Sequence, residues 1–172
     1  MKKQTIGLIS VVFLVLTIVL SFILYNEWPL LTGKKIVLAI QPIDPFDPFR
    51  GQYMSINYEI STINNVEGFI EGDSIYVTLE KDEQGIWRLK ETSKTKPSEG
   101  IFIKGKITNS YDKRVWVEYG VEQFFFERNA MLPTSNISVE VRVSNSGRAK
   151  LVQLLKNGEP IEIEYEKFDI RS

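Results

Sequence analysis

The stretch SIYVTLE, Ser74 to Glu80, has the pattern that governs most of this chain. Its apolar residues Ile75, Val77 and Leu79 alternate with more polar ones, so a β-strand would place all three on one face. The same period of two recurs in IFIKGKI, RVWVEYGV, ISVEVRV and IEIEYE further along the chain. A surface helix would instead space its apolar residues three and four positions apart. The sequence therefore predicts a domain built mainly of β-strands.

Turn-forming residues separate these segments and favour antiparallel hairpins. DEQG ends at Gly85, NSG ends at Gly147, and an Asn-Gly pair stands at residues 157–158. Asn-Gly suits the positive φ angles that two-residue hairpin turns require. Short strands joined in this way predict an antiparallel β-sandwich or a barrel-like domain. The stretch GRAKLVQLLK, residues 147–156, would also suit a helix, but the turn residues on either side of it favour a strand.

An uncharged apolar run, IGLISVVFLVLTIVLSFILY, occupies residues 6–25 and predicts one transmembrane helix before the β domain. About 20 helical residues, each rising about 1.5 Å, span a hydrocarbon core of about 30 Å. Tyr25 and Trp28 fall where an interfacial aromatic belt would lie, and Pro29 is expected to end the helix. A cleaved signal peptide, the main alternative, has an apolar region of about 7–15 residues that ends in small residues at the cleavage site. Because this run is longer and lacks such a site, we predict an uncleaved signal anchor.

The charges beside this run predict the orientation of the chain. Lys2 and Lys3 precede it, while Lys34 and Lys35 follow it at a greater distance. The positive-inside rule then favours, by a narrow margin, an amino terminus inside the cell and a domain outside. We predict a single-pass protein of the cell membrane that contacts the lipid bilayer through residues 6–25. Its parts are a cytoplasmic amino terminus, a transmembrane signal anchor, a juxtamembrane linker and an extracytoplasmic β domain, at residues 1–5, 6–25, 26–34 and 35–172.

The composition excludes several classes of function. The chain has no Cys and no His, which excludes disulfides, thiolate nucleophiles, sulfur-ligated zinc and Ser-His-Asp triads. Its 21 basic residues nearly balance its 22 acidic ones, without the basic excess that is typical of a nucleic-acid-binding protein. We therefore predict no catalytic residue, no metal, no cofactor and no nucleic-acid partner.

The segment QPIDPFDPFRGQ, residues 41–52, repeats with a period of three, as a polyproline II helix does. Its three rows are the prolines Pro42, Pro45 and Pro48, the apolar Ile43, Phe46 and Phe49, and the charged Asp44, Asp47 and Arg50. We predict a stiff corner whose apolar row packs on the β core. Asp44 and Asp47 alternatively suggest a Ca²⁺ site, because carboxylates are ligands of that ion. Two carboxylates about 9 Å apart along such a helix do not converge on one ion, so the structural corner is our prediction.

The stretch RGQYMSINY, which follows this corner, resembles the signature of the GDYXXLXY family, small bacterial proteins of unknown function. Gly51, Tyr53 and Tyr58 match its letters, Ile56 replaces its Leu, and Gln52 stands in place of its Asp. The resemblance continues in IDPFDPFRG, GDSIYVTLE, GIFIKGKI, YGVEQFFFE and NGEPI. It implies a bacterial membrane-anchored domain, association with multi-spanning membrane proteins, and no known activity. The candidate structural or recognition residues of the motif are therefore Arg50, Gly51, Tyr53, Ile56 and Tyr58.

These observations favour a non-enzymatic binding or structural module that is held at the outer face of the membrane and partners another membrane protein. Four aromatic side chains are predicted to face outward and could form a recognition surface, although we expect at least half of them to be packed: Tyr53, Tyr76, Phe102 and Trp116. The alternative is a membrane-anchored hydrolase that uses a Ser-Lys pair or two carboxylates. Signal peptidases, which share this layout, place their Ser soon after the anchor, but here no Ser lies between Ser21 and Ser55.

Overall fold

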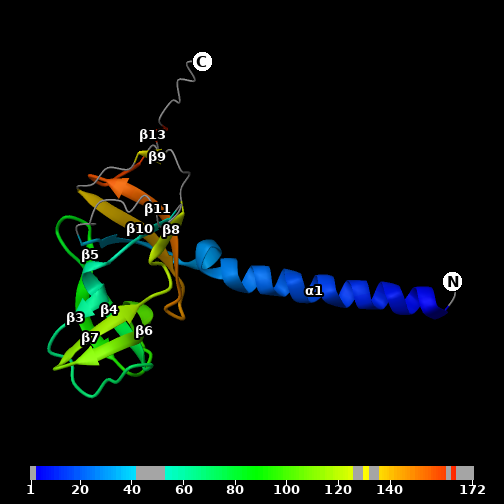
Figure 1. Cartoon of the computed structure of the whole chain (residues 1–172), viewed down its shortest axis with the longest axis horizontal. Coiled ribbons are helices and arrows are strands. Elements are labelled where there is room, and N and C mark those ends of the chain that lie inside the picture. Colours follow the sequence, from blue (N-terminus) through cyan, green and yellow to red (C-terminus); the bar gives the residue numbers. More distant parts are fainter. Residues whose placement is uncertain (1–2, 42–52, 126–129, 132–135, 162–163, 166–172) are drawn as a thin grey trace, which may run out of the picture.

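The computed structural model describes residues 3–41, 53–125, 130–131, 136–161 and 164–165 of the chain. Within them, one long helix, α1 (Lys3–Thr32), leads into a β domain and points away from it (Figure 1). The predicted mainly β domain behind a single apolar helix is confirmed. The predicted polyproline corner and the start of the motif lie outside the described residues: Pro42, Asp44, Pro45, Phe46, Asp47, Pro48, Phe49, Arg50 and Gly51.

The strands of the β domain follow α1 along the chain. They are β1 (Lys34–Ala39), β2 (Tyr53–Ser55), β3 (Thr62–Ile63), β4 (Ser74–Lys81), β5 (Trp87–Ser93), β6 (Ile101–Tyr111), β7 (Arg114–Glu118), β8 (Gln123–Phe125), β9 (Ala130–Met131), β10 (Ile137–Val143), β11 (Ala149–Lys156), β12 (Glu159–Pro160) and β13 (Glu164–Tyr165). A 3-10 turn, η1 (Glu59–Ser61), precedes β3. The stretch GRAKLVQLLK forms β11, so its prediction as a strand is confirmed.

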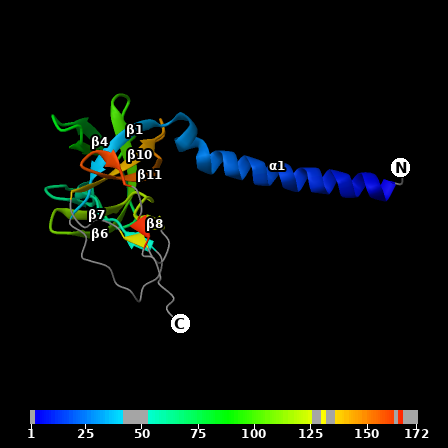
Figure 2. The ribbon, with the colours of Figure 1, turned by 90° about the horizontal axis from the view of Figure 1, so that it is seen from above.

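Nine of these strands form one sheet in the order β12-β11-β10-β1-β5-β4-β6-β7-β3. Its neighbouring strands are antiparallel except β1 and β5, which meet in parallel at Leu38 and Trp87. The sheet bends so that the turn before β11 reaches β6, where the Lys104 N–H donates to the Gly147 carbonyl at 2.8 Å. Figures 1 and 2 show β10 and β11 in one half of the domain and β6 and β7 in the other. Among the described residues the fold is therefore an open mixed sheet, not a closed barrel.

One apolar cluster unites the two halves of the domain. It includes the three residues of β4 that the alternating pattern predicted to face inward, Ile75, Val77 and Leu79, each at most 4% exposed. Burial of such a side chain contributes about 1.5–3 kcal/mol. The other half of the sheet supplies further members from β1, β10 and β11: Ile36, Leu38, Val139, Val141, Val143 and Leu154.

Strand β10 departs from the simple alternation, because its second face is covered as well. Glu140 lies on that face and is only 4% exposed. Its carboxylate is satisfied by Lys35, at 2.6 Å, and by the side-chain amide of Gln153, at 3.0 Å. On the same strand, Arg142 reaches the end of α1 and donates to the Leu30 carbonyl at 2.7 Å. Polar side chains on this face of β10 thus bond both to neighbouring strands and to the end of the helix.

Helix α1 continues through Pro29, which we had predicted to end it. Proline has no N–H, so the Tyr25 carbonyl loses its usual helical donor. Arg148, just before β11, supplies a replacement and donates to that carbonyl at 2.9 Å. The helix then closes with a bond from the Gly33 N–H to the Pro29 carbonyl at 2.8 Å, and β1 follows directly. Most of the stretch predicted as a linker, residues 26–34, is therefore helical. The Tyr25 carbonyl, which loses its helical donor to Pro29, is satisfied by Arg148 from a distant part of the chain.

Candidate functional site

The second half of the motif enters the domain as a strand. Tyr53–Ser55 forms β2 and pairs with β8, and the Ile56 N–H continues this pairing by donating to the Glu122 carbonyl at 2.6 Å. Ile56 itself is 1% exposed and belongs to the apolar core. Tyr58, two residues further along the chain, is fully buried as well.

Tyr58 and Tyr119 form two crossed hydrogen bonds between distant segments. The Tyr58 hydroxyl donates to the Val121 carbonyl at 2.6 Å, and the Tyr119 hydroxyl donates to the Ile60 carbonyl at 2.6 Å. The Glu122 carboxylate accepts from the Tyr119 N–H and holds the turn that carries Val121. We call this arrangement the tyrosine latch. It fastens the segment after the motif to the segment that follows β7.

Burial controls the chemistry of the latch hydroxyls. It raises the pKa of Tyr58 and of Tyr119 well above the usual value, and the negative charge of Glu122 raises both further. Both phenols stay protonated at neutral pH and act as hydrogen-bond donors. The latch therefore serves structure, and it does not offer a general base at neutral pH.

The same segment also ties the motif to the end of β1. The Gln41 N–H donates to the Asn57 carbonyl at 2.8 Å, and the Asn57 side-chain amide donates to the Gln41 side-chain oxygen at 2.7 Å. Ile40 and Tyr58 form a bridge beside them. These bonds hold the residues directly after β1 beside the latch.

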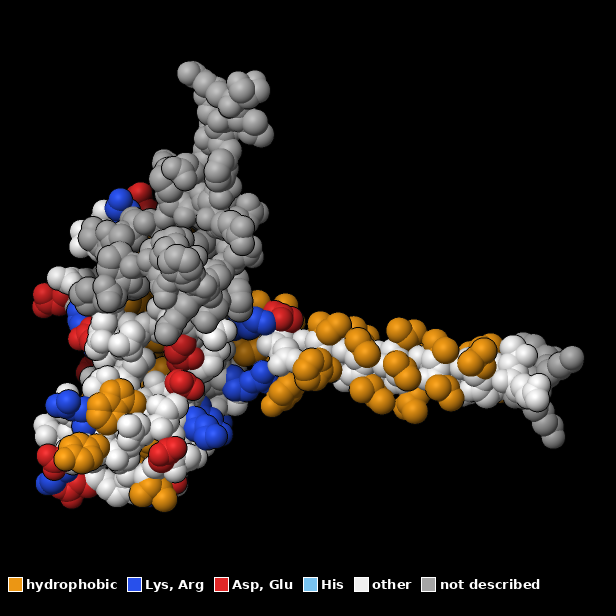
Figure 3. Space-filling model, in the orientation of Figure 1, with side chains coloured by type: hydrophobic (Ala, Val, Ile, Leu, Met, Phe, Trp, Pro, Cys, Tyr) orange, Lys and Arg blue, Asp and Glu red, His pale blue; other side chains and the backbone are white. Residues whose placement is uncertain are grey.

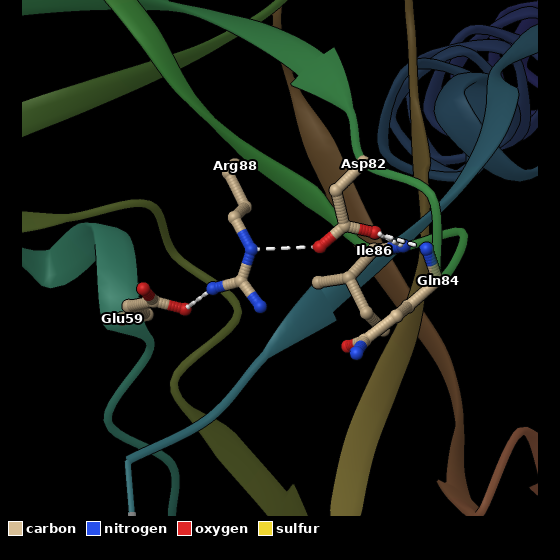
Figure 4. Close-up of polar contacts among 5 residues, drawn as sticks. All are labelled: Glu59, Asp82, Gln84, Ile86 and Arg88. Atoms are coloured by element: carbon tan, nitrogen blue, oxygen red, sulfur yellow. Dashed lines mark hydrogen bonds and ion pairs between the residues drawn. The ribbon is translucent and has the colours of Figure 1, made fainter.

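An ion-pair network holds η1 from the other side (Figure 4). Asp82 accepts from the N–H groups of Gln84 and Ile86, each at 2.9 Å, and from Nε of Arg88 at 2.7 Å. Arg88 also pairs with Glu59, the residue after the motif. The bond from Arg88 is the main reason that the pKa of Asp82 lies below its usual value. The sequence DEQG predicted only a turn here, since nothing local indicates that Arg88 reaches across to η1.

The outward-facing aromatic residues of the sequence analysis are partly enclosed. Tyr76 and Phe102 form an edge-to-face pair with ring centres 5.8 Å apart. Phe102 is only 7% exposed, because the turn at Gly147 lies over its ring. Tyr76 and Trp116 are half-buried, and nothing is described of the Tyr53 side chain. The prediction that Phe102 faces outward is therefore wrong, and its ring is not available to a recognition surface.

A shallow hollow of about 210 Å³ lies between the loop before β6 and the turn after β10. Its lining combines lysines, polar side chains and one aromatic ring: Lys34, Lys96, Pro97, Ser98, Gly100, Ile101, Phe102, Val143, Ser144 and Asn145. The buried Ser144 hydroxyl is hydrogen-bonded within its own turn, to Ser146 at 2.9 Å and to the Arg148 carbonyl at 3.2 Å. That hydroxyl is consequently engaged in holding the turn.

Three cations of the β10–β11 hairpin hold the carboxyl-terminal end of α1. Arg148 donates to the Tyr25 carbonyl, and its guanidinium lies 4.1 Å from the centre of the Tyr25 ring. Lys150 pairs with Glu27, two residues further along the helix, and Arg142 donates to the Leu30 carbonyl, three residues beyond Glu27. Cations are favourable at this end of a helix, where carbonyl groups lack helical partners. No sequence pattern predicted these contacts, and an Arg directly after the NSG turn is the only local sign of them.

A family model matches most of the chain, including the residues described above. The family model described as "GDYXXLXY protein" matches residues 15–154. The chain belongs to the GDYXXLXY family. The match begins inside α1 and ends inside β11, so it includes the helix junction as well as the latch. No curated protein and no solved structure gives a significant match.

The GDYXXLXY signature has a structural meaning in this member of the family. Ile56, at the Leu position, is a core residue, and Tyr58, at the final Tyr position, supplies a latch bond. Tyr53 is placed in β2 by its backbone. The described part of the signature therefore fixes how the segment after residues 42–52 joins the sheet.

Proposed function

We propose that this GDYXXLXY protein is a single-pass protein of the cell membrane whose β domain is a non-enzymatic binding or structural module outside the cell. We propose further that it partners a multi-spanning membrane protein. The observation that carries the proposal is the surface of α1. Its large apolar side chains from Ile6 to Trp28 are between 46% and 70% exposed. Exposed apolar area of this extent requires a bilayer or other membrane helices to cover it.

The composition supports the non-enzymatic part of the proposal. Without Cys and His, the chain has no thiolate nucleophile and no imidazole base. A Ser-Lys hydrolase, the rival proposal, needs a free Ser hydroxyl beside a desolvated Lys. The Ser144 hydroxyl already has two partners, and Lys34 at the same hollow is exposed to water. These contacts weigh against that rival.

The test is quantitative capture of the full chain from native membranes after mild solubilisation. We expect one multi-spanning membrane protein to co-purify in a constant ratio to the chain. A control that contains α1 without the β domain should not capture it. Recovery of the chain alone, or of the same proteins with the helix-only control, would contradict a partner for the domain.

A second measurement addresses catalysis directly. Ser55→Ala should leave the function in cells unchanged, because its hydroxyl is not proposed to react. Loss of function in a variant that still folds and reaches the membrane would favour the hydrolase.

A further inference from the structure

The level of Arg148 relative to a bilayer follows from its contact with Tyr25. The guanidinium lies 4.1 Å from the ring centre, and its Nη1 donates to the Tyr25 carbonyl at 2.9 Å. Tyr25 is the last residue of the uncharged run 6–25. A charged side chain is costly inside hydrocarbon, whereas Tyr favours the interface. When this run spans the bilayer, Arg148 lies where the hydrocarbon meets the headgroups.

Arg148 retains donors for an anion at that level. A guanidinium has five N–H groups in a planar fork that matches phosphate oxygens. Among the described residues, the Arg148 side chain makes one hydrogen bond, to Tyr25. The adjacent turn exposes Asn145 and Ser146, whose polar side chains lie at the same end of the hairpin. This end of the domain can therefore contact a polar, negatively charged layer.

The charges around the helix exit favour an anionic partner. Figure 3 shows Lys and Arg side chains on the side of the domain from which α1 leaves. The two acidic residues beside them are already paired, Glu27 with Lys150 and Glu140 with Lys35. No described acidic side chain neutralises Arg148, which contacts a carbonyl and a ring instead. An anionic group can therefore pair with Arg148 at the helix exit, although the chain as a whole has a net charge of −1.

We propose that the turn Ser144–Arg148 lies in the headgroup layer and that Arg148 binds the phosphate of an anionic membrane phospholipid. The proposal rests on the proposed membrane span. It adds that the domain lies directly on the bilayer surface, on its β10–β11 side. Pro29 has a part in this arrangement, because its missing N–H leaves the Tyr25 carbonyl free to hold Arg148 at that depth.

The absence of Cys allows single reporters to be introduced into the full chain in lipid nanodiscs. Fluorescent labels are placed on Ser146→Cys, in the turn, and on Tyr111→Cys, in the β6–β7 hairpin on the side away from α1 (Figures 1 and 2). Tyr111 is 76% exposed, so its replacement disturbs no packing. A lipid that carries a nitroxide on its headgroup should quench the label at 146 several-fold more strongly than the label at 111. Equal quenching would overturn the proposal.

The lipid chemistry is tested with nanodiscs of phosphatidylcholine alone and with a third of phosphatidylglycerol. Quenching at 146 should rise with the anionic lipid in the wild type and should not rise in Arg148→Gln. The matched control is Arg114→Gln, which removes an exposed arginine at the start of β7 that bonds to Asn64. Quenching in this variant should depend on the lipid as it does in the wild type. Dependence on phosphatidylglycerol that persists in Arg148→Gln would overturn the role of Arg148.

A third reporter separates failure of this inference from failure of the proposed span. Val15→Cys, at a helix position that is 51% exposed, should be quenched by a nitroxide on the acyl chain. Quenching at 15 without quenching at 146 would overturn only the surface contact. Absence of quenching at 15 would overturn the span and, with it, this inference.

Discussion

Tyr58 and Tyr119 show how much a single buried hydroxyl can determine. Each donates to a carbonyl about sixty positions away, and each carbonyl lies in a segment without a long strand to hold it. A buried acceptor that loses its donor costs about 1–3 kcal/mol, which is a large part of the stability of a domain. The two bonds cross, so removal of one leaves the other to hold the segments alone.

Tyr58→Phe and Tyr119→Phe should therefore each lower the free energy of unfolding by about 1–3 kcal/mol. Tyr111→Phe is the matched control, because Tyr111 is largely exposed, and its change should stay within about 0.5 kcal/mol. Urea unfolding of the full chain in detergent, followed by tryptophan fluorescence, measures all three. A Tyr58→Phe variant as stable as the control would refute the latch.

The raised phenol pKa values also predict a loss of stability at alkaline pH. In the unfolded chain both phenols ionise near their usual value of 10.0, whereas in the folded chain they stay protonated to higher pH. The folded state then binds more protons than the unfolded state, so stability falls as the pH rises above about 10. Absorbance titration at 295 nm should find two tyrosines that ionise only as the domain unfolds. In Tyr58→Phe, one such tyrosine should remain.

At this scale the alternation of side chains predicted which residues are buried and not what they bond to. The pattern placed Ile75, Val77 and Leu79 on one face, and all three are buried. No pattern could predict that Tyr58 bonds to the Val121 carbonyl, since that contact depends on the order of strands in space. The prediction that Phe46 and Phe49 anchor a polyproline corner stays a prediction, because both lie outside the described residues.

Among the elements, the β10–β11 hairpin connects the most parts of the molecule. On one side of its turn, Arg148 donates to the Tyr25 carbonyl of the helix. On the other side, the Gly147 carbonyl accepts from the Lys104 N–H of β6. Gly147 makes the second contact possible. It has a φ of +83°, and a Cβ atom there would lie 2.8 Å from the Phe102 ring and 3.0 Å from the Lys104 nitrogen.

Gly147→Ala should consequently be more damaging than a glycine replacement elsewhere. Gly158, in the next turn, has a similar φ of +86° but open space where a Cβ would lie. Gly158→Ala should cost only the left-handed strain, about 1–2 kcal/mol. Gly147→Ala should also displace Phe102 and Lys104, which should lower the free energy of unfolding by about 1–3 kcal/mol more. Unfolding midpoints in urea compare the two, and equal losses would mean that the hairpin can move away from β6 without cost.

The same hairpin explains why the end of α1 was mispredicted. The rule that proline ends a helix counts one lost hydrogen bond and a steric conflict within the helix. It omits a donor from another element, and here Arg148 supplies that donor from 119 positions beyond Pro29. Local sequence therefore predicted the strands well, because alternation is visible in each strand by itself. It predicted the helix end poorly, because this end depends on a donor from a distant segment.

For the whole molecule, the sequence predicted the class of the fold better than its arrangement. An apolar helix followed by alternating strands is visible in the residues themselves. The neighbours of β1, which are β10 and β5, are not visible, since they lie far from it along the chain. The direct connection between α1 and β1 is not visible in the sequence either, because it depends on the contact of distant Arg148 with the helix. Helix and domain meet with only Gly33 between them, so the orientation of the helix also sets that of the domain.

The last prediction concerns which side of the membrane the domain occupies. The positive-inside rule counts Lys and Arg within about 15–20 residues of the ends of a span. Arg142 and Arg148 are therefore outside the count, despite their contact with α1, because they lie far along the chain. Lys2 and Lys3 remain on one side and Lys34 and Lys35 on the other. Only two residues separate the first pair from the apolar run, whereas eight separate the run from the second pair, which favours the domain outside.

Protease added to intact spheroplasts should then degrade the β domain and leave a cytoplasmic marker protein intact. Since the two flanking pairs of lysines differ little in their effect, replacement of either pair should change the share of chains that have the domain outside. Lys2→Gln with Lys3→Gln should leave a larger share of the domain protected, whereas Lys34→Gln with Lys35→Gln should leave less. The second pair also removes the partner of Glu140, so its folding is checked separately by fluorescence. A wild-type domain that is protected until the spheroplasts are lysed would reverse the orientation, and the headgroups on Arg148 would then be those of the inner leaflet.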